Sequence, residues 1–211
     1  MDTSTTRFLQ QENIRLQKEN EALQRKNRAL SHYLDMVKEL YWFNQHIASD
    51  ENPLNVLDQL LYKVISTIGA DDGSLSYLDE ETSELVFVLV HGDLREQLPG
   101  YRIKSDDGIA GWVVSNQKPI IVNTPRQDWR FSLEVDQDFS FFTRSIASVP
   151  VIAKDRAIGV IQLVNKHDNE FTEADIALLL VLSQVATKAL EAKPPQLEAR
   201  SPEEIENLPG D

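Results

Sequence analysis

The 211-residue sequence contains no cysteine. Without thiols the chain can form no disulfide, no thiolate zinc site and no cysteine nucleophile, and no cofactor can be attached through sulfur. Histidine is also scarce, and the spacing of His32, His46, His91 and His167 is not that of metal ligands. No Ser/His/Asp set, paired catalytic carboxylates or phosphate-cradling glycine loop is recognisable. The sequence therefore predicts no metal, no cofactor and no enzyme activity.

Long apolar runs are missing as well. The longest wholly apolar run, residues 176–182, is far too short to span a bilayer. The first 13 residues contain no apolar signal core. The absence of cysteine also fits a reducing compartment. We therefore expect a cytoplasmic protein without a membrane partner.

Basic residues are outnumbered by acidic ones. The chain has 21 Lys and Arg against 34 Asp and Glu, which gives a formal charge of −13. Such a chain repels nucleic-acid phosphates, so we expect no nucleic-acid partner. The densest basic cluster, residues 25–28, lies on a predicted helix that also carries Glu19 and Glu21. We interpret this cluster as a solvated helix face.

Residues 7–47 contain neither glycine nor proline and are predicted to form one long helix. Apolar residues recur in it every seven positions, a period that indicates a left-handed coiled coil. An asparagine at an a position pairs with its twin across a parallel two-stranded interface. The sequence therefore predicts a parallel homodimer, and the alternative is a single solvated helix. The predicted seam has Leu9, Leu16, Leu23 and Leu30 at d and Asn13, Asn20 and Asn27 at a.

The chain divides into three predicted parts: a dimerisation helix over residues 1–47, an α/β domain over 48–192 and a flexible acidic tail over 193–211. Apolar periodicity predicts helices at 54–68, 106–114 and 172–192, and strands at 74–79, 85–91, 119–122, 145–153 and 157–166. Pro150 indicates an edge or bulge position in its strand. Residues 123–142 mix aromatic and charged residues without a period. Because this segment is long for a connection, we interpret it as a lid or pocket wall.

Three sequence segments, taken in order, resemble the GAF domain. They are GIAGWVVSNQKPIIVN, then DWRF at residues 128–131, and IGVIQLVNK followed by FTEAD. GAF domains are the small-molecule sensing modules of cyclic-nucleotide phosphodiesterases, phytochromes and bacterial signalling proteins, and the resemblance covers about residues 54–192. It implies an α/β fold of the α+β type, with a central antiparallel sheet and flanking helices, here preceded by the long helix. It further implies a ligand pocket lined by Ile109, Ala110, Phe131, Phe139, Phe142, Thr143 and Ser145.

Cyclic-nucleotide-binding GAF domains carry Asn-Lys, a variable gap, Phe, three residues and Asp-Glu. This sequence is similar, with Asn165, Lys166, Phe171 and Asp175, but Ile176 replaces the glutamate. In the family the lysine and the aspartate pair and support the pocket. Residues 172–175 also form a T-x-x-D capping box, which explains Asp175 without any ligand. Bilin attachment and free methionine-sulfoxide reduction on this fold both use a cysteine, which is absent here.

Two functional hypotheses follow from these residues and the resemblance. In the first, the protein is a dimeric signalling sensor that binds a small molecule, a cyclic nucleotide among the candidates, and relays binding through its helices to a signalling protein partner. In the second, it is a dimerisation or scaffold protein whose pocket is filled by its own side chains, Phe139, Phe141 and Phe142.

Overall fold

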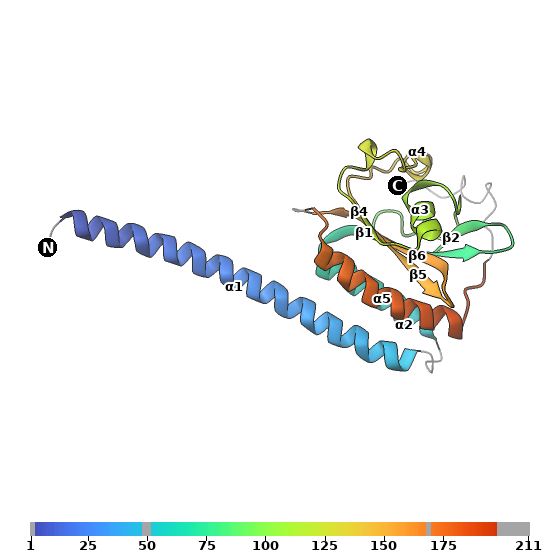
Figure 1. The fold of residues 1–211 in the computed structure, drawn as a ribbon, viewed down its shortest axis with the longest axis horizontal. Helices are drawn as coiled ribbons and strands as arrows, with labels where there is room; N and C mark the ends of the chain where they lie inside the picture. The colour runs from blue at the N-terminus through green and yellow to red at the C-terminus, as the bar shows by residue number, and fades with distance from the viewer. Residues whose placement is uncertain (1–2, 48–51, 168–169, 198–211) are drawn as a thin grey trace.

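The computed structural model describes residues 3–47, 52–167 and 170–197. A six-stranded antiparallel sheet carries helices on both faces, and a long N-terminal helix extends away from this domain (Figure 1). The predicted fold class, a central antiparallel sheet with flanking helices, is confirmed. Across the described ranges, no helix combines the length and apolarity needed to cross a membrane.

The elements follow the sequence pattern closely. The helices are α1 (Thr3–His46), α2 (Pro53–Ile68), α3 (Gly108–Asn116), α4 (Glu134–Asp138) and α5 (Glu173–Ala192), with the short 3-10 helix η2 (Pro125–Gln127). The strands are β1 (Ala70–Asp79), β2 (Glu84–His91), β3 (Arg102–Lys104), β4 (Ile120–Val122), β5 (Ile146–Ala153) and β6 (Arg156–Lys166). Their order in the sheet is β3-β2-β1-β6-β5-β4, which places β1 and β6 at its centre.

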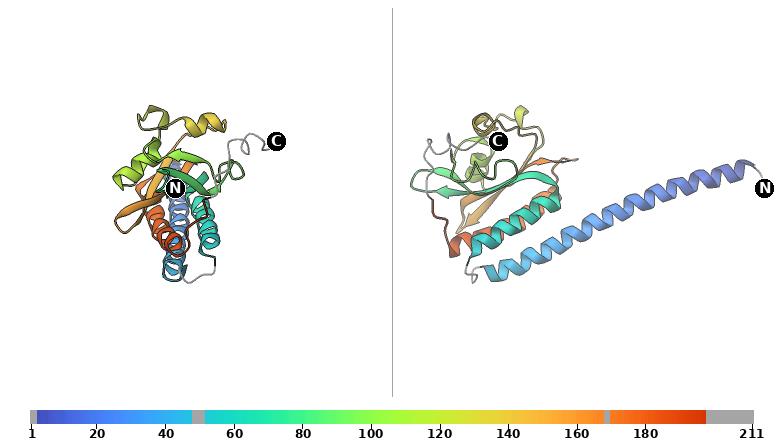
Figure 2. Two further views of the ribbon diagram at one scale, coloured as in Figure 1. Left: turned by 90° about the vertical axis from the view of Figure 1, so that its right-hand side faces the viewer. Right: turned by 180° about the vertical axis from the view of Figure 1, so that it is seen from behind.

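One face of the sheet packs against α2 and α5, and the second half of α1 lies outside these two helices (Figure 2). Alternate strand residues such as Leu75, Val149 and Ile161 point into this layer and are buried. The apolar stripe of α2 and both apolar faces of α5 complete the core. Leu40 of α1 is fully buried there. This layer therefore joins the long helix to the sheet.

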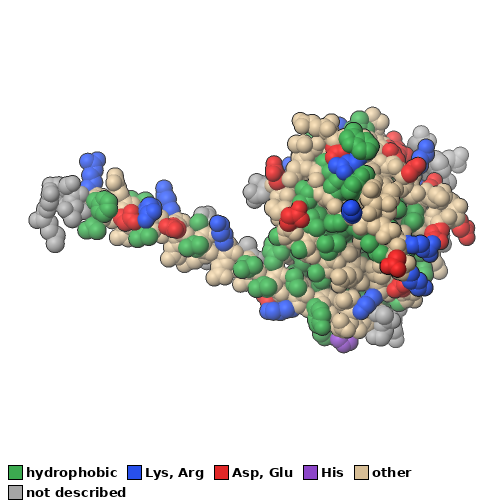
Figure 3. Space-filling view, in the orientation of Figure 1, with side chains coloured by type: hydrophobic (Ala, Val, Ile, Leu, Met, Phe, Trp, Pro, Cys, Tyr) green, Lys and Arg blue, Asp and Glu red, His purple; other side chains and the backbone are tan. Residues whose placement is uncertain are grey.

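The first half of α1 projects away from the domain. Its predicted seam leucines, Leu9, Leu16, Leu23 and Leu30, are 51–60% exposed in the single chain. Hydrophobic side chains lie along this projecting helix in the space-filling view (Figure 3). An isolated helix gains little from such a narrow apolar stripe unless a partner buries it.

Pro150 lies in β5 at a position where only one neighbouring strand is paired. It pairs with Val160 of β6, whereas β4 pairs with β5 only from Ile146 to Ser148. The register of β5 against β6 shifts immediately afterwards, between Val151 and Ile152. The missing N–H of proline therefore removes no bond to β4, and the position agrees with the edge or bulge position predicted for this proline.

Candidate functional site

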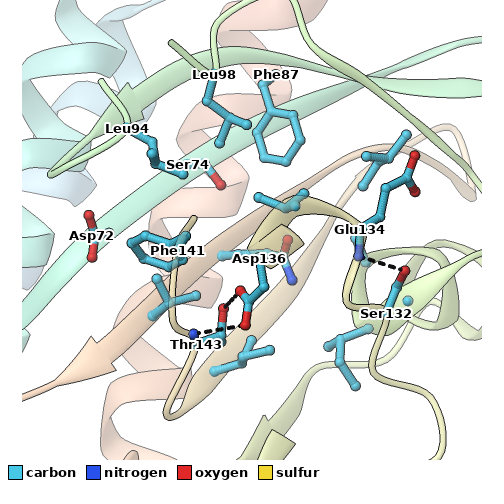
Figure 4. A pocket seen from close by; sticks show the side chains of 18 of the residues that line it. Asp72, Ser74, Phe87, Leu94, Leu98, Ser132, Glu134, Asp136, Phe141 and Thr143 are labelled. Atoms are coloured by element: carbon cyan, nitrogen blue, oxygen red, sulfur yellow. Dashed lines mark hydrogen bonds between the residues drawn. The ribbon is translucent and has the colours of Figure 1, made fainter. Parts of the chain in front are cut away.

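A cavity of about 120 Å3 lies on the face of the sheet opposite α2 and α5. Strands β1, β2, β5 and β6 form its floor, and α3, the segment after β2 and the segment 131–143 close over it (Figure 4). Most of its walls are apolar. The apolar side chains are Phe87, Val90, Leu94, Leu98, Ile103, Ile109, Ala110, Phe131, Val135, Phe141, Ile146 and Val164. An apolar, concave site with few polar groups is the usual form of a small-molecule pocket.

The floor of the cavity contains polar residues. Ser74 of β1 pairs with Gln162 of β6 across the two central strands, and both line the cavity. Asp72 lies two residues before Ser74 on the same strand, so its side chain points to the same face. Figure 4 shows Asp72 at one end of the cavity and Ser132 with Glu134 at the other.

The lid is held down by Asp136 of α4, a buried residue that lines the cavity. Its carboxylate accepts hydrogen bonds from the Thr143 backbone N–H at 3.1 Å and the Thr143 hydroxyl at 2.6 Å (Figure 4). On the other side it pairs with Arg126 at 2.6 Å. Arg126 belongs to η2 and Thr143 lies just before β5, so Asp136 connects the two ends of the stretch between β4 and β5.

Two asparagines attach the lid segment and the α5 entry to the sheet. Asn165 has a left-handed backbone (φ 61°), a conformation that asparagine tolerates better than most residues. Its side chain accepts the Arg144 N–H at 2.7 Å and donates to the Phe142 carbonyl at 3.1 Å. Asn123, just after β4, accepts the Phe171 N–H at 3.0 Å. These contacts fix where β5 begins and where the chain enters α5.

Asp175, in the first turn of α5, is fully buried and joins three parts of the fold. It pairs with the Lys166 ammonium at 2.5 Å and accepts the Thr172 backbone N–H at 2.8 Å. Its other oxygen accepts the Tyr33 hydroxyl of α1 at 2.6 Å. Burial, followed by the Asp175 carboxylate, raises the pKa of Tyr33 above its ordinary value, so the phenol stays a donor. One carboxylate thus connects the end of β6, the start of α5 and the long helix.

The charged groups around the cavity are predominantly acidic. Four carboxylates line it, those of Asp72, Asp107, Glu134 and Asp136, and no lysine or arginine is among the described residues that line it. Burial raises the pKa of Asp72, and the carboxylates of Asp93 and Asp71 act in the same direction, while its hydrogen bond from Asp93 N–H and the Arg144 charge oppose it. The site is therefore electrostatically unfavourable for an anion.

The raised pKa of Asp72 predicts that Asp72→Asn makes the free protein more stable. A folded pKa above the unfolded value means that the favourable contribution is present at low pH and is lost as the pH rises through the folded pKa. At pH 7 the asparagine can still accept the Asp93 N–H, but it carries no buried charge. We expect a gain of roughly 1 kcal/mol in the free energy of unfolding at pH 7.

Urea denaturation at pH 7 and at about pH 4, near the ordinary aspartate pKa, measures this effect. The gain should shrink at the lower pH, because the raised pKa of Asp72 makes its carboxyl group protonated to a larger extent in the folded than in the unfolded protein. Asp107→Asn is the matched control, because Asp107 lines the same cavity but is exposed. A loss of stability in Asp72→Asn at pH 7 would contradict the argument.

A family model described as GAF domain matches residues 51–191. The chain belongs to the GAF domain family. A curated relative, the probable 3',5'-cyclic phosphodiesterase pde-5 of Caenorhabditis elegans, is 30% identical over 132 residues. The match covers 56% of this chain and 18% of the relative, so the chain spans less than a fifth of that protein.

Solved structures share the GAF fold. The GAF domain of an Acinetobacter phosphoenolpyruvate-protein phosphotransferase is 22% identical with a TM-score of 0.62, and the match covers 76% of this chain and 94% of that one. The free methionine-R-sulfoxide reductase of Neisseria meningitidis, solved in complex with its substrate, is also 22% identical, with a TM-score of 0.60 and coverage of 72% and 86%. At this identity the similarity shows the fold alone. The fold therefore occurs both as a domain of a phosphotransferase and in a reductase.

The GAF sequence motifs have structural explanations in this chain. Gly111 of GIAGW lies so close to the Asp106 backbone that a Cβ would be 2.6 Å from the Asp106 carbonyl carbon. In DWRF, the Arg130 guanidinium binds Asp128 with two hydrogen bonds of 2.6 and 2.8 Å and lies over the Trp112 ring of α3. These residues hold the lid segment and α3 together.

The predicted pocket residues of the GAF domain fall into two groups. Ile109, Ala110, Phe131 and Thr143 line the cavity together. The other three lie elsewhere. Phe139 packs beside Phe87, Val90, Leu94 and Leu98, Phe142 is 60% exposed beneath Arg126, and Ser145 accepts the Lys166 N–H at 3.1 Å outside the cavity.

Asp72, Ser74, Phe141 and Asp136 line the cavity but are not among the residues predicted from the sequence. Asp72 and Ser74 alternate along β1 and could have been assigned to one face of the sheet. The alternation alone does not say which face is the pocket. Asp136 and Phe141 lie in a segment without a period, so no sequence signal marks their direction.

Proposed function

We propose that this chain is a dimeric, non-enzymatic GAF sensor that binds a small molecule in the cavity and relays binding through α1. The observation that carries the proposal is the cavity itself, with apolar walls and a polar floor at Ser74 and Gln162. If the domain served only as a scaffold with a filled pocket, the lid phenylalanines would close this space. Instead Phe141 lines it and Phe142 points to solvent.

The relay is supported by the contacts of Asp175. The Asn165 side chain of β6 donates to the Phe142 carbonyl at the end of the lid, and the neighbouring Lys166 pairs with Asp175. Asp175 in turn binds Tyr33 of α1. A ligand that moves the lid would therefore act on β6 beside the residue that anchors the long helix. Through this helix the shift would reach a signalling protein partner.

The proposed dimer is parallel and uses the exposed leucine seam of the projecting half of α1. The three asparagines at a positions favour this orientation, because each then meets its twin. A cytoplasmic location remains a prediction from the composition. Cyclic nucleotides remain candidate ligands, since the curated relative is named as a cyclic-nucleotide phosphodiesterase.

Native mass spectrometry of the purified full chain tests the proposal, because it reports both stoichiometry and retained ligand. We expect a dimer that carries a small molecule. If no ligand is retained through purification, we expect at least one compound from a broad set of nucleotides and metabolites to raise the thermal unfolding temperature. Ser74→Phe, which fills the cavity, should abolish binding and keep the dimer. Ser66→Phe places the same side chain on the exposed surface of α2 and should leave binding unchanged. If no compound binds the wild-type chain, the scaffold hypothesis is favoured.

A further inference from the structure

Asp72 is positioned by a close contact with the turn that follows β2. The residue is only 7% exposed, and its Oδ1 accepts the Asp93 N–H at 2.7 Å. The close approach of the turn to the carboxylate requires a glycine at position 92. A Cβ there would lie 2.1 Å from Asp72 Oδ1, and the backbone has a φ of 105°. The carboxylate is therefore held in one orientation by the local fold.

The second oxygen of Asp72 has no donor. Oδ2 is buried, and no hydrogen-bond partner reaches it from the described part of the chain. A buried carboxylate oxygen without a donor is costly, and native proteins contain few such groups. An asparagine could accept the Asp93 N–H equally well without a buried charge. The carboxylate is thus unnecessary for the turn, and its free oxygen lies at a residue that lines the ligand cavity.

The basic side chains in this region already contact other carboxylates. Arg144 pairs with Asp71 at 2.5 Å, and Arg126 pairs with Asp136 at 2.6 Å. The His91 Nε2 atom lies 2.9 Å from Asp58 Oδ1. The donor for Asp72 Oδ2 is therefore best supplied by a molecule in the cavity.

The shape and charge of the cavity define the class of this molecule. Four carboxylates line the cavity, of which Asp136 is paired with Arg126, and no lysine or arginine lines it among the described residues, so the cavity favours a cation over an anion. Beside Asp72 the walls are apolar: Leu94, Leu98, Phe87 and Phe141 surround this end (Figure 4). They would accept an aromatic or aliphatic body.

We propose that the ligand is a small organic amine, whose protonated nitrogen donates to Asp72 Oδ2 while its apolar body packs against Phe87, Leu94 and Phe141. This inference rests on the proposed function, because it names the chemistry of the ligand of the same cavity. An ammonium group both supplies the missing donor and neutralises the buried carboxylate, so the contact is a charge-assisted hydrogen bond. The phosphate of a cyclic nucleotide supplies neither a hydrogen-bond donor nor a positive charge.

Three probes of one shape and different charge test the proposal on the full chain: 2-phenylethylamine, 2-phenylethanol and 3-phenylpropanoate. Dissociation constants are measured by NMR titration, with cyclic GMP as a fourth probe. We expect the amine to bind about tenfold or more tightly than the alcohol, and the two anions to bind more weakly still.

Asp72→Asn should bring the amine and the alcohol to within about threefold of each other, because the alcohol depends only on the apolar walls. Asp107→Asn removes one carboxylate at the same cavity without touching the buried one, so it should keep the preference for the amine. The increase in stability expected for Asp72→Asn provides an independent check that the variant is folded.

The outcomes separate this inference from the function on which it rests. If the alcohol, the propanoate or cyclic GMP binds as tightly as the amine, or if Asp72→Asn keeps the preference, the amine proposal is wrong and the sensor function stands. If none of the four probes binds and native mass spectrometry detects no retained ligand, both are overturned.

Discussion

Replacing Asp175 by alanine is expected to lower the free energy of unfolding by about 3–5 kcal/mol, the range observed when one partner of a buried ion pair is removed. Asp175 is fully buried, and the Lys166 side chain is only 12% exposed. The substitution would leave the ammonium group without its partner. It would also remove the acceptor for the Thr172 N–H and for the Tyr33 hydroxyl.

Urea denaturation followed by circular dichroism, at one fixed protein concentration, measures this effect. Tyr33→Phe is the matched partial change, because it removes only the contact from α1 and keeps the ion pair. We expect it to cost about 1 kcal/mol, the typical contribution of one hydrogen bond. If Asp175→Ala costs no more than Tyr33→Phe, neither the ion pair nor the capping bond from Thr172 contributes measurably, and the Tyr33 hydrogen bond accounts for the stabilisation by Asp175.

A double-mutant cycle that combines Asp175→Ala with Lys166→Met completes the test of this network. Lys166→Met leaves the Asp175 carboxylate with hydrogen-bond donors but without a cation, and the double variant removes the pair entirely. Because the two residues are in direct contact, their effects should not be additive. Additive effects would mean that the capping bonds of Thr172, rather than Lys166, account for the stabilisation by Asp175.

Leu23→Asp is expected to convert the protein from a dimer to a monomer. In a parallel coiled coil the two copies of Leu23 face each other at a d position, so the variant places two carboxylates in an apolar seam. Burying an unpaired charge costs several kcal/mol, and each 1.4 kcal/mol changes the dissociation constant about tenfold. We therefore expect the dissociation constant of the dimer to rise by about a hundredfold or more.

Sedimentation equilibrium of both proteins over a range of micromolar concentrations measures this change. Ala22→Asp is the matched control: it introduces the same side chain one residue earlier, at an outward c position of the heptad. That variant should remain a dimer. A wild-type chain that is monomeric throughout this range would show that the leucine seam is not a dimer interface, and so would a Leu23→Asp variant with unchanged self-association.

Local patterns were enough to predict most of the fold. The absence of glycine and proline over residues 7–47 predicts the long helix, and the structure contains α1. Alternation in strands such as β6 and the apolar stripe of α2 depend only on neighbouring residues, because a strand repeats every two residues and a helix every 3.6. The capping box at Thr172 and Asp175 is equally local, and the Asp175 carboxylate accepts the Thr172 N–H as expected.

The candidate site was only partly predictable, because it collects residues from several strands and loops. Ile109 and Ala110 line the cavity because α3 is a regular helix over the sheet. In the lid, neighbouring phenylalanines point in different directions. Phe141 lines the cavity, whereas Phe142 is exposed to solvent and its ring contacts the Arg126 guanidinium. Polar contacts of Asp136 and Asn165 with residues several positions away set these directions, and no period in the sequence encodes them.

The amino-acid sequence by itself determined the family, the order of most elements and the exclusion of cysteine chemistry, because each depends on composition or on residues close together in the chain; β3, η2 and α4 were not predicted. Only the tertiary structure decided that Asp72 is buried with one carboxylate oxygen without a partner among the described residues, and that Tyr33 joins Asp175 across 142 residues. Both depend on which elements pack together. The burial of a carboxylate and the partner of a phenol are set by distant segments, and local pattern carries no information about them.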